Sequence, residues 1–295
     1  MTNERLIPKG YPKFLKKKIA SGGHANQVRK LLAHLNLTTV CENAKCPNLG
    51  ECFGSQTATF MILGDTCTRN CSFCGVNHGV PKPVEADEPH RIAEAVKVLN
   101  LRHVVVTSVT RDDLADGGAF HFASVIQAVR EKRDATIEVL TPDFGGDLKS
   151  INIVVEAQPD VFNHNVETIE RLYPVVRPQA DYQRSLNLFK VIKKKNKSIL
   201  TKSGFMVGVG ETFEEVVELM SDLRKADCEL LTVGQYLRPT QQSLEVSRFV
   251  TPEEFEKIEK KALELGFLAA KCAPFVRSSY HAAAVLDALH RDSSV

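Results

Sequence analysis

Six cysteines grouped in two short triplets are the residues of this chain with the clearest chemical potential. The first triplet is Cys41, Cys46 and Cys52, and the second is Cys67, Cys71 and Cys74. Three thiolates can hold an iron–sulfur cluster while leaving one iron without a cysteine ligand, whereas four cysteines favour electron transfer or a structural role. The spacing therefore predicts two clusters, each with an iron that is open to chemistry.

Other uses of clustered cysteines fit this spacing less well. Structural zinc sites usually pair two C-x-x-C units, but only Cys71 and Cys74 have that spacing, although His78 would complete four ligands with the second triplet. A disulfide framework is typical of small secreted domains, whereas this chain has 295 residues and can build its own core. A thioredoxin-like C-x-x-C motif stands alone after a strand, whereas Cys71 and Cys74 belong to a triplet. Cys228 and Cys272 lie in apolar runs, so we expect them to be buried.

Size and composition are those of an ordinary globular protein. The chain has 295 residues, 25% of them charged, and a net charge of +2, which favours neither nucleic acid nor a membrane surface as a partner. No apolar run is long enough for a membrane helix, and the N-terminus lacks the apolar stretch of a signal peptide. Eight cysteines without such a signal indicate a reducing compartment, and we expect the cytoplasm. An organellar form that has lost its transit peptide would have the same features.

The elements that must position these cysteines follow from an alternating pattern. Six short runs rich in β-branched residues predict strands at 58–63, 103–107, 136–140, 160–162, 198–207 and 229–236. Helical periodicity separates them, and alternation of this kind predicts a parallel sheet with right-handed crossovers. Six units are too few for an eight-fold barrel, so a curved (β/α)6 partial barrel fits best. Periodicity alone does not distinguish it from a flat, doubly wound sheet.

Local signals place helix ends and divide the chain into three parts. Thr212 with Glu215, and Thr251 with Glu254, have the form of capping boxes. We expect an N-terminal extension at 1–57 that carries the first triplet, a barrel at 58–265 and a C-terminal extension at 266–295. Within the N-terminal extension we predict a helix at 26–35, and a loop around the first triplet, where Pro, Asn and Gly gather.

Polar clusters recur where the predicted strands end. The second triplet begins shortly after the first strand, and other clusters lie at 108–118, 141–143, 163–167, 208–211 and 235–238. In parallel α/β folds the carboxyl ends of the strands meet at one rim, where active sites lie. These segments therefore predict one shared site.

The second triplet, with Phe73 before its third cysteine, resembles the cluster motif of the radical S-adenosylmethionine (SAM) superfamily. The resemblance implies that the three thiolates hold a 4Fe–4S cluster whose fourth iron binds the amino and carboxylate groups of SAM. It also implies that reduction of SAM releases a 5′-deoxyadenosyl radical. The six-unit partial barrel is the fold of that superfamily.

The first triplet, in the run ENAKCPNLGECF, is similar to the auxiliary-cluster motif of the lipoyl synthase family. The resemblance extends from about residue 35 to residue 285 and includes TSVTRDDLADGGAFHF and KSGFMVGVGET. It ends in the RSSY motif at residues 277–280, of which one serine is implied to bind the fourth iron of the auxiliary cluster. By position we expect this ligand to be Ser279, with Ser278 as the second choice.

The resemblance implies a sulfurtransferase. Two sulfur atoms enter C6 and C8 of an octanoyl chain that is linked to a lysine of a carrier domain. Acid–base groups cannot break these C–H bonds, so a radical from SAM is required, and the auxiliary cluster is consumed as the sulfur source. Oxygen suits iron less well than sulfur does, so we expect Ser279 to leave easily as the cluster is dismantled.

Several rim residues are candidates for contacts with SAM, and each has an alternative structural role. Expected cofactor contacts are Phe73, Gly117, Gly118, Asn165, Glu167, Gly208 and Gly210. The glycine pairs serve equally well in turns, and Asn165 in a helix cap. Either Arg177 or Arg184 would suit the SAM carboxylate, but both could be surface residues. We expect His164 to be structural.

The resemblance also implies partners. These are octanoylated carrier domains (the E2 subunits of 2-oxoacid dehydrogenases and the glycine cleavage H protein), an electron donor such as ferredoxin or flavodoxin, and a cluster-repair protein. Lysines 16–18, together with Lys193, Lys194, Lys195 and Lys197, would attract an acidic carrier, although a helix end is the default explanation of the second group. The remaining alternatives are a biotin synthase-like enzyme, an iron–sulfur carrier or sensor, and a zinc-stapled binding module.

Overall fold

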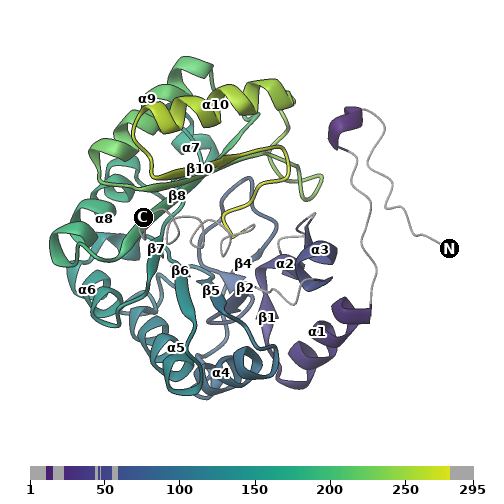
Figure 1. Cartoon of the computed structure of the whole chain (residues 1–295), viewed down its shortest axis with the longest axis vertical. Helices are drawn as coiled ribbons and strands as arrows, with labels where there is room; N and C mark the ends of the chain where they lie inside the picture. The colour runs from purple at the N-terminus through teal and green to yellow at the C-terminus, as the bar shows by residue number, and fades with distance from the viewer. Residues whose placement is uncertain (1–10, 16–22, 44–45, 47, 55–58, 280–295) are drawn as a thin grey trace, which may run out of the picture.

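The computed structural model of this chain describes residues 11–15, 23–43, 46, 48–54 and 59–279. Within them a curved sheet is surrounded by helices (Figure 1). The lysines at 16–18 and the last residue of the RSSY motif lie outside the described residues.

Eight strands form the main sheet, in the order β1-β2-β5-β6-β7-β8-β9-β10. Their bounds are β1 (Thr38–Thr39), β2 (Thr59–Ile62), β5 (His103–Ser108), β6 (Thr136–Leu140), β7 (Val161–Asn163), β8 (Leu200–Val207), β9 (Leu230–Gln235) and β10 (Ala269–Cys272). All neighbours from β2 to β10 pair in parallel, and β1 joins β2 antiparallel. Because β1 and β10 do not pair with each other, the sheet is an open partial barrel.

The six predicted strands are confirmed as β2 and β5 to β9, with ends that differ by a few residues. The sheet also contains β10, a seventh parallel strand, in the residues that we expected to form the C-terminal extension. Its sequence, AAKC, has none of the β-branched residues by which the other strands were predicted. The extension therefore continues the sheet past the six repeated units.

Helices cover the outer side of the sheet, as Figure 1 shows for α4, α5, α6, α8, α9 and α10. The α-helices are α1 (Gly23–His34), α2 (Val40–Asn43), α3 (Leu49–Gly54), α4 (Glu88–Val98), α5 (Ala119–Lys132), α6 (Leu148–Glu156), α7 (Tyr173–Val176), α8 (Tyr182–Lys195), α9 (Phe213–Lys225) and α10 (Pro252–Glu264). Short 3-10 helices lie at Lys13–Leu15, Phe144–Gly146 and Glu170–Leu172. Among the described residues no helix is both long and apolar enough to cross a membrane.

Both predicted capping boxes are present. The Thr212 side chain accepts a hydrogen bond from the backbone N–H of Glu215 at the start of α9, and Thr251 does the same with Glu254 at the start of α10. In each box the glutamate side chain accepts a hydrogen bond from the backbone N–H of the threonine. Two backbone N–H groups that have no partner within the helix are thereby hydrogen-bonded. These contacts set where the two helices begin.

The prediction of a loop around the first triplet is wrong for two of its cysteines. Cys41 lies in α2 and Cys52 in α3, and both helices are too short to show a helical period in the sequence. Tertiary packing stabilises them instead, because Cys41 belongs to the same buried cluster as Val28 and Leu32 of α1. The predicted helix at 26–35 is confirmed as α1.

The inner face of the sheet carries charged and polar side chains as well as apolar ones. Apolar residues of β5, β6 and β7 pack outward in one cluster with α4, α5 and α6, so the alternate residues point inward. Among them Glu138 of β6 lies 2.8 Å from the Nζ atom of Lys202 on β8 and accepts a hydrogen bond from Asn163 of β7. This pairing holds the pKa of Glu138 at about 2 despite its burial.

Candidate cluster and cofactor site

A cavity of about 580 Å³ lies beside the carboxyl ends of the parallel strands and brings the two triplets together. Five of the six triplet cysteines line it, together with both serines of the RSSY motif: Cys41, Cys46, Cys67, Cys71, Cys74, Ser278 and Ser279. Cys52 is not part of the wall, but it is close enough to Cys41 for its charge to raise the pKa of that thiol. Segments from both ends of the described chain therefore meet in one site.

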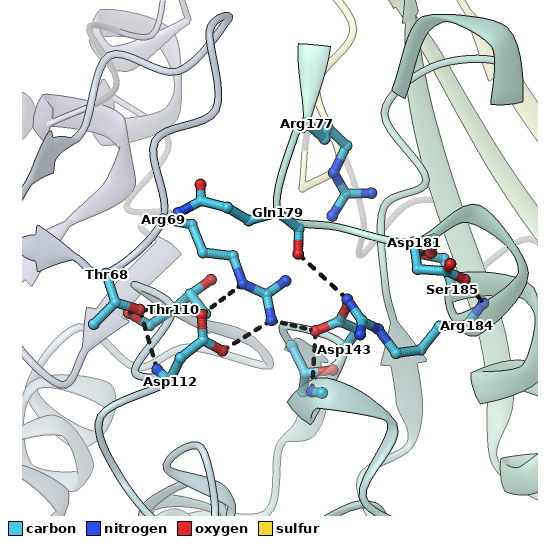
Figure 2. Close-up of polar contacts among 12 residues, drawn as sticks. Thr68, Arg69, Thr110, Asp112, Asp143, Arg177, Gln179, Asp181, Arg184 and Ser185 are labelled. Carbon is cyan, nitrogen blue, oxygen red and sulfur yellow. Dashed lines mark hydrogen bonds and ion pairs between the residues drawn. The ribbon is translucent and has the colours of Figure 1, made fainter. Parts of the chain in front are cut away.

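The loop of the second triplet is held by a buried arginine. Arg69, between the first two cysteines of that triplet, pairs with Asp112 through Nε at 2.7 Å and Nη2 at 2.8 Å, and with Asp143 through Nη2 at 2.7 Å (Figure 2). Only 6% of the Arg69 side chain is exposed and none of the Asp143 side chain is, so the second pair is shielded from solvent. The loop is thereby tied to the segments that follow β5 and β6.

The same network continues to α8. Arg184 donates from Nε to the second carboxylate oxygen of Asp143 at 2.8 Å and from Nη2 to the Gln179 carbonyl (Figure 2). The Gln179 side chain in turn accepts a hydrogen bond from the backbone N–H of Asn70. Two guanidinium groups beside one buried carboxylate hold the pKa of Asp143 far below its usual value.

Backbone donors point at the sulfur atom of Cys67. The N–H groups of Arg69 and Thr110 lie 3.4 and 3.3 Å from its Sγ atom. Such donors tune the potential of a bound cluster. Burial raises the pKa of Cys71, and burial together with the neighbouring thiols raises that of Cys41 to about 12, so a metal that bound these thiols would have to displace protons.

The chain around the first triplet is fastened to the segment that precedes Ser278. Asn48 donates from Nδ2 to the carbonyl of Phe275 at 2.7 Å, across 227 positions of sequence. The backbone of Thr59 is close enough to the Cys41 thiol to lower its pKa, and the Thr59 hydroxyl donates to Ser279 Oγ at 2.8 Å. Thr59 therefore places an oxygen of Ser279 on the side of the cavity where Cys41 lies.

Ser278 faces the predicted SAM contacts instead. Its Oγ atom accepts a hydrogen bond of 2.6 Å from Nδ2 of Asn165, and the same amide donates to Glu167 Oε1 at 3.0 Å. Burial raises the pKa of Glu167, and the nearby Arg177 opposes that shift. The two adjacent serines thus contact different parts of the site.

The cavity wall presents polar atoms that suit a polar cofactor. The hydroxyls of Ser108 and Thr141 and the Oδ1 atom of Asn165 belong to residues of the wall, are buried, and have no hydrogen-bond partner among the described residues. Buried polar groups are normally paired, so orphaned atoms in a cavity wall indicate a ligand. Phe73 also lines the cavity, and the set fits a molecule with hydroxyl, amino and carboxylate groups such as SAM.

The predicted glycine contacts are not in the cavity wall. Gly117, Gly118, Gly208 and Gly210 are absent from its lining. The N–H of Gly118 binds Asp116, and a Cβ atom there would lie 2.3 Å from Leu63. The N–H of Gly208 binds Glu211, and both glycines have positive φ angles of 89° and 96°. Turn geometry and packing account for these two glycines, and their contact with SAM remains a prediction.

The structure separates the two candidate arginines. Arg177 lines the cavity and is buried, with Nη1 donating to the carbonyls of Asn165 and Val166, whereas Arg184 serves the Asp143 network outside the wall. His164 contacts the Thr141 carbonyl and Ser185 Oγ, and burial lowers its pKa to about 4. A neutral, doubly hydrogen-bonded imidazole is the structural residue that we expected.

The other two cysteines, Cys228 and Cys272, lie outside the cavity wall. Cys228 and Cys272 are buried, as expected, and none of the eight cysteines forms a disulfide. In the part of the chain that the structure describes, no three His, Cys, Asp or Glu side chains gather tightly enough to hold a single metal ion. A 4Fe–4S cluster does not require its cysteines to surround one ion, because each cysteine binds a different iron.

Three contributors to the site escaped sequence reasoning. Thr59 lies in a buried strand, and Gly204 and Arg69 carry no pattern that separates them from structural residues. Arg69 was detectable in principle, because an arginine inside a metal-binding loop must find an anion when the loop is buried. Thr59 donates to a serine 220 positions away, and Gly204 lies against Thr232, Asn165 and Ser278, which are also distant in the sequence, so no local signal reveals these contacts.

Comparison with known proteins gives close relatives. A family model described as the Radical SAM superfamily matches residues 61–223. The chain is 56% identical to a lipoyl synthase from Caldanaerobacter subterraneus subsp. tengcongensis, over 92% of this chain and 95% of the relative. It is 52% identical to a lipoyl synthase from Rubrobacter xylanophilus, over 92% of this chain and 85% of the relative.

Solved structures share the fold at low sequence identity. The complex of Streptococcus suis SuiB with the precursor peptide SuiA matches 77% of this chain and 53% of that protein, with a TM-score of 0.58 and 11% identity. Methylornithine synthase matches 86% of this chain and 84% of that protein, with a TM-score of 0.50 and 16% identity. At these identities the similarity concerns the fold alone.

Proposed function

The chain belongs to the lipoyl synthase family of radical SAM enzymes, and from this we infer that the cavity described above is its site of sulfur insertion. The reaction of the family adds two sulfur atoms, at C6 and C8, to an octanoyl chain carried on a protein lysine. Two 4Fe–4S clusters and SAM are its cofactors. The observation that supports the assignment of the site is that five triplet cysteines and both serines line a single cavity.

We propose one role for each triplet. Cys67, Cys71 and Cys74 would hold the cluster that binds SAM, which supplies a radical able to abstract hydrogen. Cys41, Cys46, Cys52 and Ser279 would hold the auxiliary cluster, which is the sulfur substrate. Phe73, Asn165, Glu167 and Arg177 would position SAM, because all four line the cavity beside the second triplet.

The protein's contribution to this chemistry is positional. Arg69 holds the loop of the second triplet, and Thr59 holds Ser279 on the Cys41 side, so the two cluster sites face one cavity. Apolar wall residues such as Val109, Leu140 and Met206 would accommodate an alkyl chain and exclude water from a radical. Gly117, Gly118, Gly208 and Gly210 remain proposed backbone contacts to SAM.

We further propose the finer details of partners and organisation. The substrate would be octanoylated E2 or glycine cleavage H domains, with ferredoxin or flavodoxin as electron donor, a separate protein that rebuilds the auxiliary cluster, and a cytoplasmic location. The three-part division at residues 57 and 265 is likewise a proposal. It is supported by the six βα units between β2 and α10, with cluster-binding segments before and after them.

Iron and acid-labile sulfide, measured on anaerobically purified protein, test the assignment. We expect about eight irons in the wild type and about four in a Cys41→Ala, Cys46→Ala, Cys52→Ala variant. The variant should still cleave SAM but should convert no octanoylated peptide. Cys228→Ala, which removes a buried thiol away from the cavity, is the control and should keep about eight irons. Four irons in the wild type, with no loss in the variant, would contradict the assignment.

A further inference from the structure

Two neighbouring serines in the RSSY motif have hydrogen-bond partners that belong to different sites. Ser279 Oγ accepts from Thr59, whose backbone contacts the Cys41 thiol. Ser278 Oγ accepts from Asn165, which also donates to Glu167. One peptide unit therefore joins the auxiliary-cluster side of the cavity to the predicted SAM side.

Asn165 is the branch point of this link. Its Nδ2 atom donates to both Ser278 and Glu167, and its Oδ1 atom is buried without a partner among the described residues. Because an amide group is planar, the two donor bonds orient the orphaned oxygen. The bond to Ser278 thus fixes how an acceptor is presented to a ligand in the cavity.

The link is tightly enclosed by the sheet. Gly204 of β8 lies under it, and a Cβ atom at this glycine would lie 2.9 Å from Asn165 Oδ1 and 3.4 Å from Ser278 Oγ. On β9 a Cβ atom at Gly234 would lie 2.1 Å from the Val276 carbonyl. The segment before Ser278 therefore sits directly on the strands and has little freedom to move independently of them.

We propose that Ser278 is a positioning residue that couples the binding of SAM to the presence of the auxiliary cluster. The inference rests on the proposed function, in which Ser279 binds iron and Asn165 contacts SAM. Iron on Ser279 fixes the adjacent Ser278, which in turn fixes Asn165, so SAM binds more tightly when the auxiliary cluster is present. Loss of the cluster as it donates sulfur would then weaken SAM binding, and the coupling must be reciprocal.

Equilibrium dialysis of labelled SAM, under anaerobic conditions without reductant, tests the coupling. The iron-loaded wild type should bind SAM about two- to tenfold more tightly than the Cys41→Ala, Cys46→Ala, Cys52→Ala variant, the effect expected of one hydrogen bond. In a Ser278→Ala background the same pair of proteins should bind SAM equally. This double-mutant cycle isolates the link, because a general loss of structure would not remove the dependence on the auxiliary cluster.

A second variant and a control complete the experiment. Gly204→Ala places a methyl group 2.7 Å from Thr232 Oγ1, 2.9 Å from Asn165 Oδ1 and 3.4 Å from Ser278 Oγ, and it should abolish the coupling although both serines are kept. Ser124→Ala, on the exposed face of α5, should keep it. Coupling that persists in Ser278→Ala, or its absence in the wild type, would overturn the inference alone. Failure of the wild type to hold about eight irons or to bind SAM would instead refute the proposed function.

Discussion

Ser279, as the proposed fourth ligand of the auxiliary cluster, would offer iron an oxygen where the other proposed ligands of both clusters offer sulfur. Its Oγ atom lies 2.8 Å from the hydroxyl of Thr59, on the side of the cavity that Cys41 lines. A thiolate binds iron more strongly than a serine oxygen does, so the oxygen is the ligand that would leave first. At the residue scale, the ease of sulfur release should depend on this one atom.

We predict that Ser279→Cys keeps about four auxiliary irons but slows the second sulfur insertion about tenfold or more. The slower step follows because the cluster must break a stronger iron–sulfur bond before it is dismantled. Single-turnover quantification of singly and doubly sulfurated octanoyl peptide would measure it. Ser124→Cys, on the exposed face of α5, controls for an added thiol. Doubly sulfurated product at the wild-type rate would refute the lability hypothesis.

Elements far apart in the barrel are joined through the loop of the second triplet. Arg69 connects that loop to the segments after β5 and β6, and Arg184 connects the Asp143 carboxylate to α8. Pairs of this kind stabilise only when their geometry is satisfied, and removing one partner leaves a buried charge. The position of the loop is therefore a property of several elements together.

We predict that Arg69→Gln lowers stability by about 3 kcal/mol, near the lower end for a broken buried pair, because Arg184 still accompanies Asp143. Iron at the second triplet should be lost to a chelator faster, while auxiliary iron is unaffected. The melting temperature and the rate of iron loss would show this. Arg130→Gln, which removes an exposed pair with Asp160, should change stability by at most about 1 kcal/mol. Equal behaviour of the two variants would contradict the role of Arg69.

At the scale of the whole molecule, the auxiliary site depends on two segments from opposite ends of the described chain. The first triplet lies before β2, and Ser279 lies after β10, at the two ends of the series of six βα units. Asn48 to Phe275 and Thr59 to Ser279 are hydrogen bonds between these segments. The proposed auxiliary cluster site would therefore form only when the sheet has brought the two segments together.

We predict that Asn48→Ala, which removes the bond to the Phe275 carbonyl, lowers stability by about 1 kcal/mol and speeds the loss of auxiliary iron to a chelator. Iron at the second triplet should be retained at the wild-type level. Asn196→Ala is the matched control, since the Asn196 side chain accepts hydrogen bonds from the neighbouring Ser198, just after α8. Loss of iron from both sites in parallel would show that Asn48 stabilises the whole fold rather than the auxiliary site.

The sequence by itself determined the features that depend on neighbouring residues. The cysteine spacings predict three-ligand cluster sites, and periodicity correctly predicted six of the seven parallel strands. The capping boxes at Thr212 and Thr251 were also predictable, because the groups that pair are three residues apart. Chemistry carried by side-chain type and short spacing is therefore visible before folding.

Only the tertiary structure decided which distant residues meet. It placed Ser279 beside Thr59 and Ser278 beside Asn165, paired Arg69 with Asp143, and left Gly118 and Gly208 outside the cavity wall. The glycines show why the sequence could not decide this: a glycine with a positive φ angle serves a turn and a close ligand contact equally well, so its presence does not distinguish the two. The serines show it too, because both lie in a turn after β10, and only the folded sheet around that turn determines which residue each hydroxyl contacts.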